Sequence, residues 1–248
     1  MTDQITYLDA AARTDAAQEY KRWLLESLDI QSGHVVVDVG CGPGTDLLAL
    51  AEAVGPDGTV IGIDADPAMV ATARSRSSQT PVIDVRQGDA HELNLPDSSV
   101  DRARVDRVLQ HLADPTRALV ELRRVLRPGG LLGLAEPDWD TLAIDDPDVA
   151  ASRAFTRFIA DRTRNGVIGR QLARLAGDAG LTVRRVRPMV VLLNGFDAAE
   201  RLLGLRRNTA RAVEGGHLSE VDAAAWLARL ETTTYPASFT FTAAVVSA

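Results

Sequence analysis

The sequence predicts an α/β fold built on a doubly wound sheet, and three observations lead to it. A β-branched run ends at Asp38 and is followed by glycines at positions 40, 42 and 44, before an apolar helical pattern begins. Strand and helix patterns alternate between residues 33 and 136, which indicates parallel strands with helices on both faces of the sheet. Acidic residues follow several strands, at the edge where open α/β sheets bind ligands.

The glycine-rich turn after the first strand indicates a binding loop for a nucleotide-like ligand. Glycine is needed there for positive φ angles, and because a Cβ would keep the ligand away from backbone N–H groups. The spacing is G-x-G-x-G, with Pro43 before the last glycine, whereas the dinucleotide fingerprint is G-x-G-x-x-G. Asp38 precedes the turn and Asp46 follows it. These carboxylates suit an adenosine that carries a cationic group better than one that carries phosphates.

The next two strands bring further acidic residues to the same edge. Residues 59–64 form the second predicted strand, and Asp64 follows Gly44 by twenty residues (64 − 44), where such folds place the acid that binds ribose hydroxyls. A strand-end cap is the alternative role for Asp64. Residues 82–87 form the third strand, and Asp89 after it suits either the exocyclic amine of adenine or an ordinary turn.

The remaining elements follow from periodicity and from helix breakers. Asp66 and Pro67 are the expected N-cap and first residue of a helix, and Pro128 with the glycines after it ends another. Further strands are predicted at 100–105, 131–135, 181–193 with a bend at Pro188, and 238–247, and further helices at 16–28, 150–163, 168–179, 197–213 and 219–230.

Four short motifs occur together and in order: Asp38-Val-Gly-Cys-Gly-Pro-Gly44, Gly62-Ile-Asp64, Gly88-Asp-Ala90 and Val125-Leu-Arg-Pro-Gly-Gly130. Together they resemble the class I S-adenosylmethionine-dependent methyltransferases. The sequence is most similar to the small-molecule, methyltransferase type 11 group of ubiquinone and menaquinone biosynthesis. The resemblance is strong over residues 33–136 and weaker on both sides. It implies a Rossmann-like, mostly parallel sheet with an antiparallel last strand beside the fifth strand.

The same resemblance implies the domain organisation and the cofactor. We expect residues 1–32 to form an N-terminal helical cap segment and residues 33–248 to form the S-adenosylmethionine-binding domain. Helices near 147–165 and 197–231 are more than the minimal fold needs, so we expect them to cap the substrate. The cofactor is expected to be S-adenosylmethionine, with S-adenosylhomocysteine as its product.

The cofactor residues implied by the resemblance lie in the four motifs and at the end of the fourth strand. Asp38 is expected to orient the loop or to reach the methionine amine, and Cys41 to pack with its backbone beside the cofactor. Most relatives carry small or polar residues where Asp106 and Arg107 stand, so a surface ion pair is the alternative role for these two. The full set is Asp38, Gly40, Cys41, Gly42, Gly44, Asp64, Ala65, Asp89, Ala90, Asp106 and Arg107.

Four residues are candidates for contact with the acceptor. His111 follows the fourth strand and is the candidate general base, because its free pKa lies near neutrality; a histidine bonded to backbone is the alternative. Tyr7, Glu136 and Trp139 are candidate substrate residues. Their alternatives are a tail residue for Tyr7 and a hydrophobic lid contact for Trp139. No His, Cys or Asp cluster has the spacing of metal ligands, so we expect no metal.

Composition restricts the function further. The 248 residues are 46% hydrophobic and 25% charged, as in ordinary globular proteins. The net charge of −7 argues against nonspecific nucleic-acid binding, and the single cysteine fits a reducing compartment. The polar, acidic N-terminus is not a signal peptide and no apolar run spans a bilayer, so a cytoplasmic enzyme is expected. Expected partners are a small-molecule substrate, with no nucleic acid and no membrane; a homodimer stays open.

These observations predict methyl transfer to an O, N or C atom of a small, apolar or aromatic metabolite. The main alternative is an S-adenosylmethionine-binding enzyme of natural-product biosynthesis that catalyses a non-methylating reaction such as cyclisation, because its cofactor site would look the same. A nicotinamide-dependent oxidoreductase is disfavoured by the glycine spacing. A nucleic-acid methyltransferase is disfavoured by the acidic charge, and no Asn-Pro-Pro-Tyr or Asp-Pro-Pro-Tyr stretch is present.

Overall fold

A computed structural model of the chain describes residues 2–232, 234 and 236–248. Its seven-stranded sheet has the order β3-β2-β1-β4-β5-β7-β6. β1 to β5 are parallel to one another, and β7 runs antiparallel between β5 and β6. The predicted fold, with an antiparallel last strand beside the fifth, is therefore confirmed. The strands are β1 (Val35–Val39), β2 (Thr59–Asp64), β3 (Ile83–Gln87), β4 (Val100–Asp106), β5 (Leu126–Ile144), β6 (Thr182–Asn194) and β7 (Pro236–Ser247).

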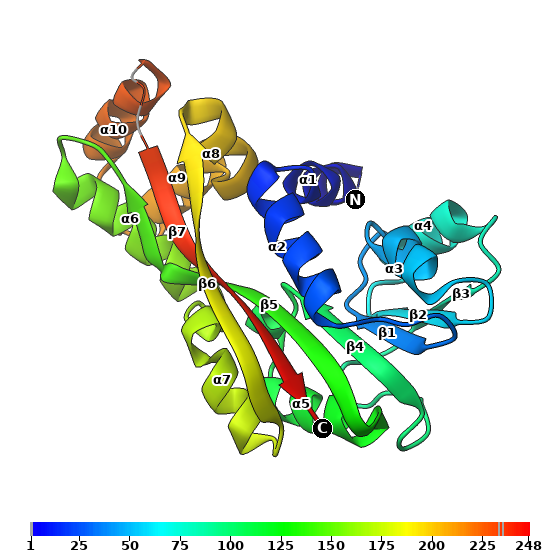
Figure 1. Ribbon diagram of the computed structural model, residues 1–248. Coiled ribbons are helices and arrows are strands. Elements are labelled where there is room, and N and C mark those ends of the chain that lie inside the picture. The colour runs from blue at the N-terminus through cyan, green and yellow to red at the C-terminus, as the bar shows by residue number, and fades with distance from the viewer. Residues whose placement is uncertain (1, 233, 235) are drawn as a thin grey trace.

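The helices fall into groups along the sheet (Figure 1). α3 and α4 lie beside β1 to β3, whereas α6, α8, α9 and α10 gather around the far ends of β5, β6 and β7. α1 and α2 lie between these two groups. The helices are α1 (Thr2–Ala12), α2 (Asp15–Ser27), α3 (Leu47–Val54), α4 (Pro67–Ser77), α5 (Pro115–Val125), α6 (Val149–Arg162), α7 (Ile168–Asp178), α8 (Phe196–Leu203), α9 (Leu205–Glu214) and α10 (Glu220–Thr232), with the short 3₁₀ helix η1 (Leu109–His111).

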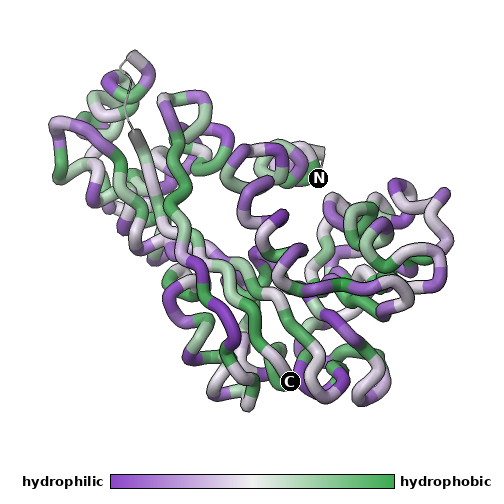
Figure 2. The backbone as a smooth tube through the Cα atoms, in the orientation of Figure 1, coloured by the Kyte–Doolittle hydropathy of each residue, from purple (hydrophilic) through white to green (hydrophobic). Residues whose placement is uncertain are grey.

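The last three strands extend the sheet well beyond the nucleotide-binding half. The prediction of a short fifth strand at 131–135 is wrong, because β5 runs to Ile144 and pairs there with Ala237 of β7 across a bulge. The upper half of β6 is hydrophobic whereas its lower half is hydrophilic (Figure 2). The extension buries Val191 and Leu193 of this part, whereas Val190 and Leu192 on its other face are exposed. In the same core Phe155 of α6 contacts Trp226 of α10 with ring centroids 4.7 Å apart.

Two further differences concern the helices. α1 was not predicted, since its sequence shows only weak amphipathic patterning; it places Tyr7 on a helix rather than in an irregular tail. The single helix predicted at 197–213 is divided at Gly204, whose φ of 58° and ψ of 54° are left-handed. Between them, α8 and α9 turn the chain over the end of β6 (Figure 1). The predicted cap of α4 is confirmed, because the Asp66 carboxylate accepts the Ala68 N–H at 2.8 Å.

We expect Gly204→Ala to destabilise the protein by about 1 kcal/mol or more, because a Cβ is unfavourable in the left-handed conformation. The nearest atom to the new Cβ, Arg207 Nη2 at 3.2 Å, belongs to a flexible side chain, so the cost comes from the backbone. Gly177→Ala is the control: it lies in α7, its φ is not positive and nothing lies within 4 Å of its Cβ position. That variant should gain roughly 0.5–1 kcal/mol. Urea unfolding measures both, and equal effects would contradict the assignment of the break to Gly204.

Candidate functional site

The carboxyl ends of β1, β2 and β4 form the predicted binding edge. The glycine loop is held to β2, because Gly40 N–H and Cys41 N–H both donate to the Ile63 carbonyl, at 2.7 and 3.0 Å. Gly42 N–H donates to Asp64 Oδ2 at 2.8 Å, and Asp64 Oδ1 accepts from Asp66 N–H at 2.9 Å. Asp64 thus orders both loops of the edge and keeps acceptor capacity on each oxygen for ribose hydroxyls.

The glycines of the loop serve different purposes. A Cβ on Gly40 would meet Val108 Cγ2 at 2.1 Å, so this position is closed by packing. Gly42 has a φ of 54°, and the nearest atom to its Cβ position is Leu8 Cδ1 at 3.8 Å. A side chain at Gly42 would therefore project into open space, on the side where a ligand would lie.

A cavity of about 310 Å³, here called the cofactor cavity, follows this edge. Nine of the eleven predicted cofactor residues line it; Asp38 and Gly44 do not, because the first lies behind Arg104 and the second packs against Ala73. The residues that line it are Gly40, Cys41, Gly42, Asp64, Ala65, Asp89, Ala90, Asp106 and Arg107. Burial raises the pKa of the Cys41 thiol above its usual range, which fits the expected packing role.

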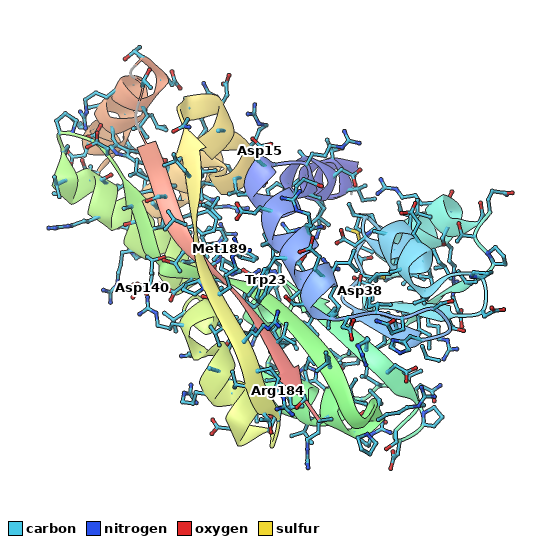
Figure 3. All side chains as sticks on the ribbon, viewed as in Figure 1. Asp15, Trp23, Asp38, Asp140, Arg184 and Met189 are labelled. Atoms are coloured by element: carbon cyan, nitrogen blue, oxygen red, sulfur yellow. The ribbon has the colours of Figure 1, made fainter. Side chains whose placement is uncertain are left out.

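The end of this cavity beside β4, called the methionine end because the family resemblance implies the methionine moiety there, contains a buried ion cluster that was not predicted from the sequence. Arg104 of β4 is the register partner of Asp38 on β1, and its Nη1 lies 3.0 Å from Asp38 Oδ1. Its Nη2 lies 2.7 Å from Asp46 and 2.6 Å from Asp106. Lys21 of α2 adds a second cation, 2.6 Å from Asp46 Oδ2. Asp38 lies near the lower end of α2 in Figure 3, where this helix passes the strands.

Burial sets the protonation of the cluster. Complete burial raises the pKa of Asp38 to about 6, although Arg104 opposes the shift. Burial would also raise the pKa of Asp46, but the charges of Arg104 and Lys21 outweigh it and hold that pKa at about 2. The pKa of Arg104 lies well above its usual range, because the nearby carboxylates outweigh its own burial. Asp46 therefore stays charged at the cavity wall across the physiological range.

Asp106 and Arg107 belong to this cluster and are not a surface pair. The side chain of Asp106 is 6% exposed, and Arg107 Nε lies 3.5 Å from its carboxylate. Arg107 adopts a left-handed φ of 58°, which turns it out of β4, and its Nε is buried without a hydrogen-bond partner. The carboxylates of Asp38, Asp46 and Asp106 thus face the cations of Arg104, Lys21 and Arg107. The Nε of Arg107 remains a buried donor without an acceptor among the described residues. The amino and carboxylate groups of a methionine moiety fit this mixed set, which supports S-adenosylmethionine as the ligand.

The adenine end is simpler. Asp89 is exposed, and its Oδ1 accepts the His91 N–H at 2.9 Å and contacts the His91 ring at 2.7 Å. The hydrogen bond from the His91 backbone N–H lowers the pKa of Asp89, and the contact with the His91 ring lowers it further. Ala90 is buried beside it. This is a turn carboxylate that lines the cofactor cavity, so its two predicted roles are compatible.

A second cavity of about 580 Å³, here called the substrate cavity, adjoins the first. Gln4, Leu8, Arg107 and His111 line both cavities. Its remaining wall is largely apolar and comes from both ends of the chain, with contributions from Tyr7, Leu202 and Leu203, and with the aromatic residues Tyr20, Trp139, Phe239 and Phe241. Trp139 is fixed by stacking on Phe239 at 4.9 Å and by donating to Gln110 Oε1 at 2.9 Å.

Glu136 is the one predicted substrate residue that lines neither cavity. It is completely buried, and its Oε1 accepts the N–H groups of Val108 and Leu109 at 2.8 and 2.6 Å. Burial raises its pKa to about 8, against these hydrogen bonds. Glu136 therefore supports η1, the turn that carries His111, from behind. Strand alternation alone does not show whether the Glu136 side chain lines the substrate cavity or lies behind η1.

The described residues contain no group of three or more His, Cys, Asp or Glu side chains arranged to hold a metal ion. Over the same residues, no helix has both the length and the apolar character needed to cross a bilayer.

Comparison with known proteins agrees with this site. The methyltransferase domain family matches residues 37–134, which span β1 to β5. An uncharacterised 37.1 kDa protein in transposon TN4556 of Streptomyces fradiae is 52% identical over 247 residues, which cover 99% of this chain and 72% of that protein. Demethylmenaquinone methyltransferase of Staphylococcus aureus is 32% identical over 130 residues. That match covers 51% of this chain and about half (54%) of the enzyme.

The fold comparison covers more of the chain. A crystal structure of an S-adenosylmethionine-dependent methyltransferase from Aquifex aeolicus superimposes with a TM-score of 0.58 at 25% identity, over 74% of this chain and 89% of that one. The motifs, the sheet order and these matches agree on the cofactor and on the fold. The chain belongs to the class I S-adenosylmethionine-dependent methyltransferases.

Proposed function

We propose that the protein transfers a methyl group from S-adenosylmethionine to an O, N or C atom of a small, apolar or aromatic molecule bound in the substrate cavity. The observation that carries this proposal is the contact between the two cavities, which share Arg107 and His111. An acceptor in the larger cavity would lie next to the methionine end of the cofactor cavity. Such placement supplies much of the rate enhancement when two reactants must meet in line.

The cofactor supplies a methyl group already activated on its sulfonium, so the chain need only bind, orient and exclude water. Asp64 is placed for the ribose hydroxyls and Asp89 for the adenine amine. Asp46 and Asp106 are placed for the amino group, and Arg107 for the carboxylate. Asp38 acts through Arg104, which it holds from behind at 3.0 Å.

The N-terminal helices close the site from above. Leu8 of α1 lines both cavities, and Asp9 on the same helix forms a two-pronged ion pair with Arg76 of α4, at 2.7 and 2.8 Å. Lys21 ties α2 to Asp46 beside the glycine loop. These contacts place an apolar cover over the junction of the cavities, which favours exclusion of water. They support the predicted cap role of residues 1–32.

His111 is placed to accept a proton from the acceptor. It lies at the junction of the cavities, and burial, followed by the charge of Arg107, lowers its pKa below 6.5. The neutral imidazole therefore predominates at pH 7, as a general base requires. Glu136 positions this residue by holding the first N–H groups of η1.

The first test is calorimetric titration with S-adenosylmethionine, S-adenosylhomocysteine and NAD. We expect the two sulfur cofactors to bind and NAD not to bind. Asp64→Ala should weaken their binding at least about tenfold, because ribose contacts and the Gly42 anchor are both lost. Asp84→Ala is the control, since this carboxylate pairs only with Arg86 on the exposed side of β3. If the folded wild type binds neither sulfur cofactor, the proposal fails. Binding without S-adenosylhomocysteine release from any acceptor would favour the non-methylating alternative.

Replacement of His111 by Gln should lower kcat on a hydroxyl acceptor by roughly 100-fold, the usual contribution of a general base. We expect the wild-type rate to rise with pH on an acidic limb below pH 6.5, and this limb to be absent in the variant. S-adenosylhomocysteine release measures the rate, and His34→Gln is the matched control, because His34 lines neither cavity. An unchanged pH profile in His111→Gln would contradict the base role.

Glu136 generates a prediction for stability against pH. Its pKa rises from 4.5 to about 8 on folding, so the native state holds the proton more tightly than the unfolded state. Wild-type stability should therefore fall as the pH rises from about 5 to about 9. Glu136→Gln cannot ionise, so its free energy of unfolding should increase relative to wild type over that interval, by roughly 2–4 kcal/mol. Urea unfolding at the two pH values measures this difference.

The control for that experiment is Glu121→Gln. Hydrogen bonding to Arg124 lowers the pKa of Glu121, so this carboxylate is ionised in both states throughout the interval. Its difference from wild type should be the same at both pH values. A constant difference for Glu136→Gln as well would show that Glu136 is ionised in the native state and would refute the prediction.

A further inference from the structure

The substrate cavity is cationic although the protein is acidic. Arg162 and Arg164 line it in addition to Arg107, which is already paired with Asp106, and among the described residues that form its wall there is no Asp or Glu. The chain as a whole carries a net charge of −7. The imbalance is therefore local, and it lies on a wall formed by α6, the turn after it, and α9.

Arg162 is held in place without being neutralised. Its Nη1 donates to Asn208 Oδ1 at 2.7 Å, and Asn208 Nδ2 donates in turn to the Leu203 carbonyl at 2.5 Å. Asn208 is 7% exposed and lines the same cavity. Both ends of its amide are thus used to orient one guanidinium. An aspartate at this position would still accept from Arg162 and would cancel its charge, although it could not donate to the Leu203 carbonyl.

Two neighbouring cations add to the imbalance. Burial, then the charges of Arg211 and Arg207 on α9, lower the pKa of Arg162. Arg207 directly precedes Asn208, which lines the cavity. Burial raises the pKa of Tyr7 on the same wall, and the charges of Arg107 and Arg207 oppose that shift. Within the described part of the chain, Arg162, Arg207 and Arg211 have no carboxylate within 4.0 Å, so an anion at this wall would relieve mutual repulsion.

Two other arginines of the cap helices are paired with carboxylates. Arg206, next to Arg207 in the sequence, lies 2.9 Å from Glu231 on α10. Arg229 of α10 lies 2.8 Å from Asp146. Neither of these two paired arginines lines the substrate cavity, whereas Arg162 does.

We propose that the acceptor carries an anionic group, of carboxylate or phosphate type, which binds Arg162 within the field of Arg207 and Arg211. The inference rests on the proposed function, because it names the chemistry of the same acceptor. A guanidinium matches either anion through paired N–H donors. The apolar body of the acceptor would then lie against Trp139 and Phe239. Arg162 and Asn208 are then the specificity-determining residues. His111 lies where the substrate cavity meets the cofactor cavity.

The test uses three probes with one apolar body: 2-naphthoate, 2-naphthyl phosphate and 2-naphthamide. Each is titrated calorimetrically into the full chain saturated with S-adenosylhomocysteine. We expect at least one anion to bind about tenfold or more tightly than the neutral amide. The two anions distinguish carboxylate from phosphate recognition.

The variants are Arg162→Gln, which removes the cation, and Asn208→Asp, which keeps an acceptor for Arg162 Nη1 and cancels its charge. Both should remove the preference for the anion and leave the affinity for 2-naphthamide within about twofold. Arg206→Gln is the control, because Arg206 is already paired with Glu231. It should retain the full preference.

Three results would overturn the inference: equal or tighter binding of the amide, a preference for the anion that survives in both variants, or no binding of either anion at about 10 mM. Saturation with S-adenosylhomocysteine is measured first in the same sample. A failure of the proposed function would appear there as loss of cofactor binding, or separately as absence of S-adenosylhomocysteine release from any acceptor. A failure of the present inference would appear only in the comparison of the anions with the amide.

Discussion

The guanidinium of Arg104 is the constraint on which the site depends. It is buried in the middle of the sheet and joins carboxylates from β1, from the start of α3 and from the end of β4. Carboxylates brought together in a low-dielectric interior repel one another, and only a buried cation with several donors holds them in one place. Through Asp46 the cluster also reaches Lys21, so that α2 is attached to the glycine loop. The cofactor edge and the N-terminal cover are therefore parts of one electrostatic unit.

A second support lies behind η1. Glu136 uses one oxygen to hold two N–H groups of this turn and leaves the other oxygen buried without a partner. The raised pKa follows from that burial, since ionisation there is not solvated. Because His111 of η1 lines both cavities, the carboxyl of β5 and the ion cluster of β4 both support the place where the two cavities meet.

Much of this could be predicted from sequence, and the failures have physical reasons. The glycine loop, Asp64 and the strands β1 to β4 could be predicted from short stretches of sequence, because β-branched runs favour strands and turn residues favour turns. The signal for Arg104 is weak. It is a charged residue between Ala103 and Val105 in a strand predicted to be buried, so it needs a partner. Only the register of β4 with β1 shows that this partner is Asp38. The length of β5 depends on its pairing with β7, and the break at Gly204 depends on the turn over β6. Both are matters of tertiary packing, which the periodicity of the sequence does not contain.

The two cavities differ in how their charges are balanced, and this difference separates their ligands. At the methionine end, three carboxylates face three cations, which suits a ligand that is itself zwitterionic. In the substrate cavity Arg162 and Arg164 have no acidic counterpart among the described lining residues, which suits an anion. An anion would be repelled by the carboxylates of the first cavity and attracted by the guanidinium groups of the second. The same electrostatics that assemble the fold would thus direct the acceptor to its own side of His111.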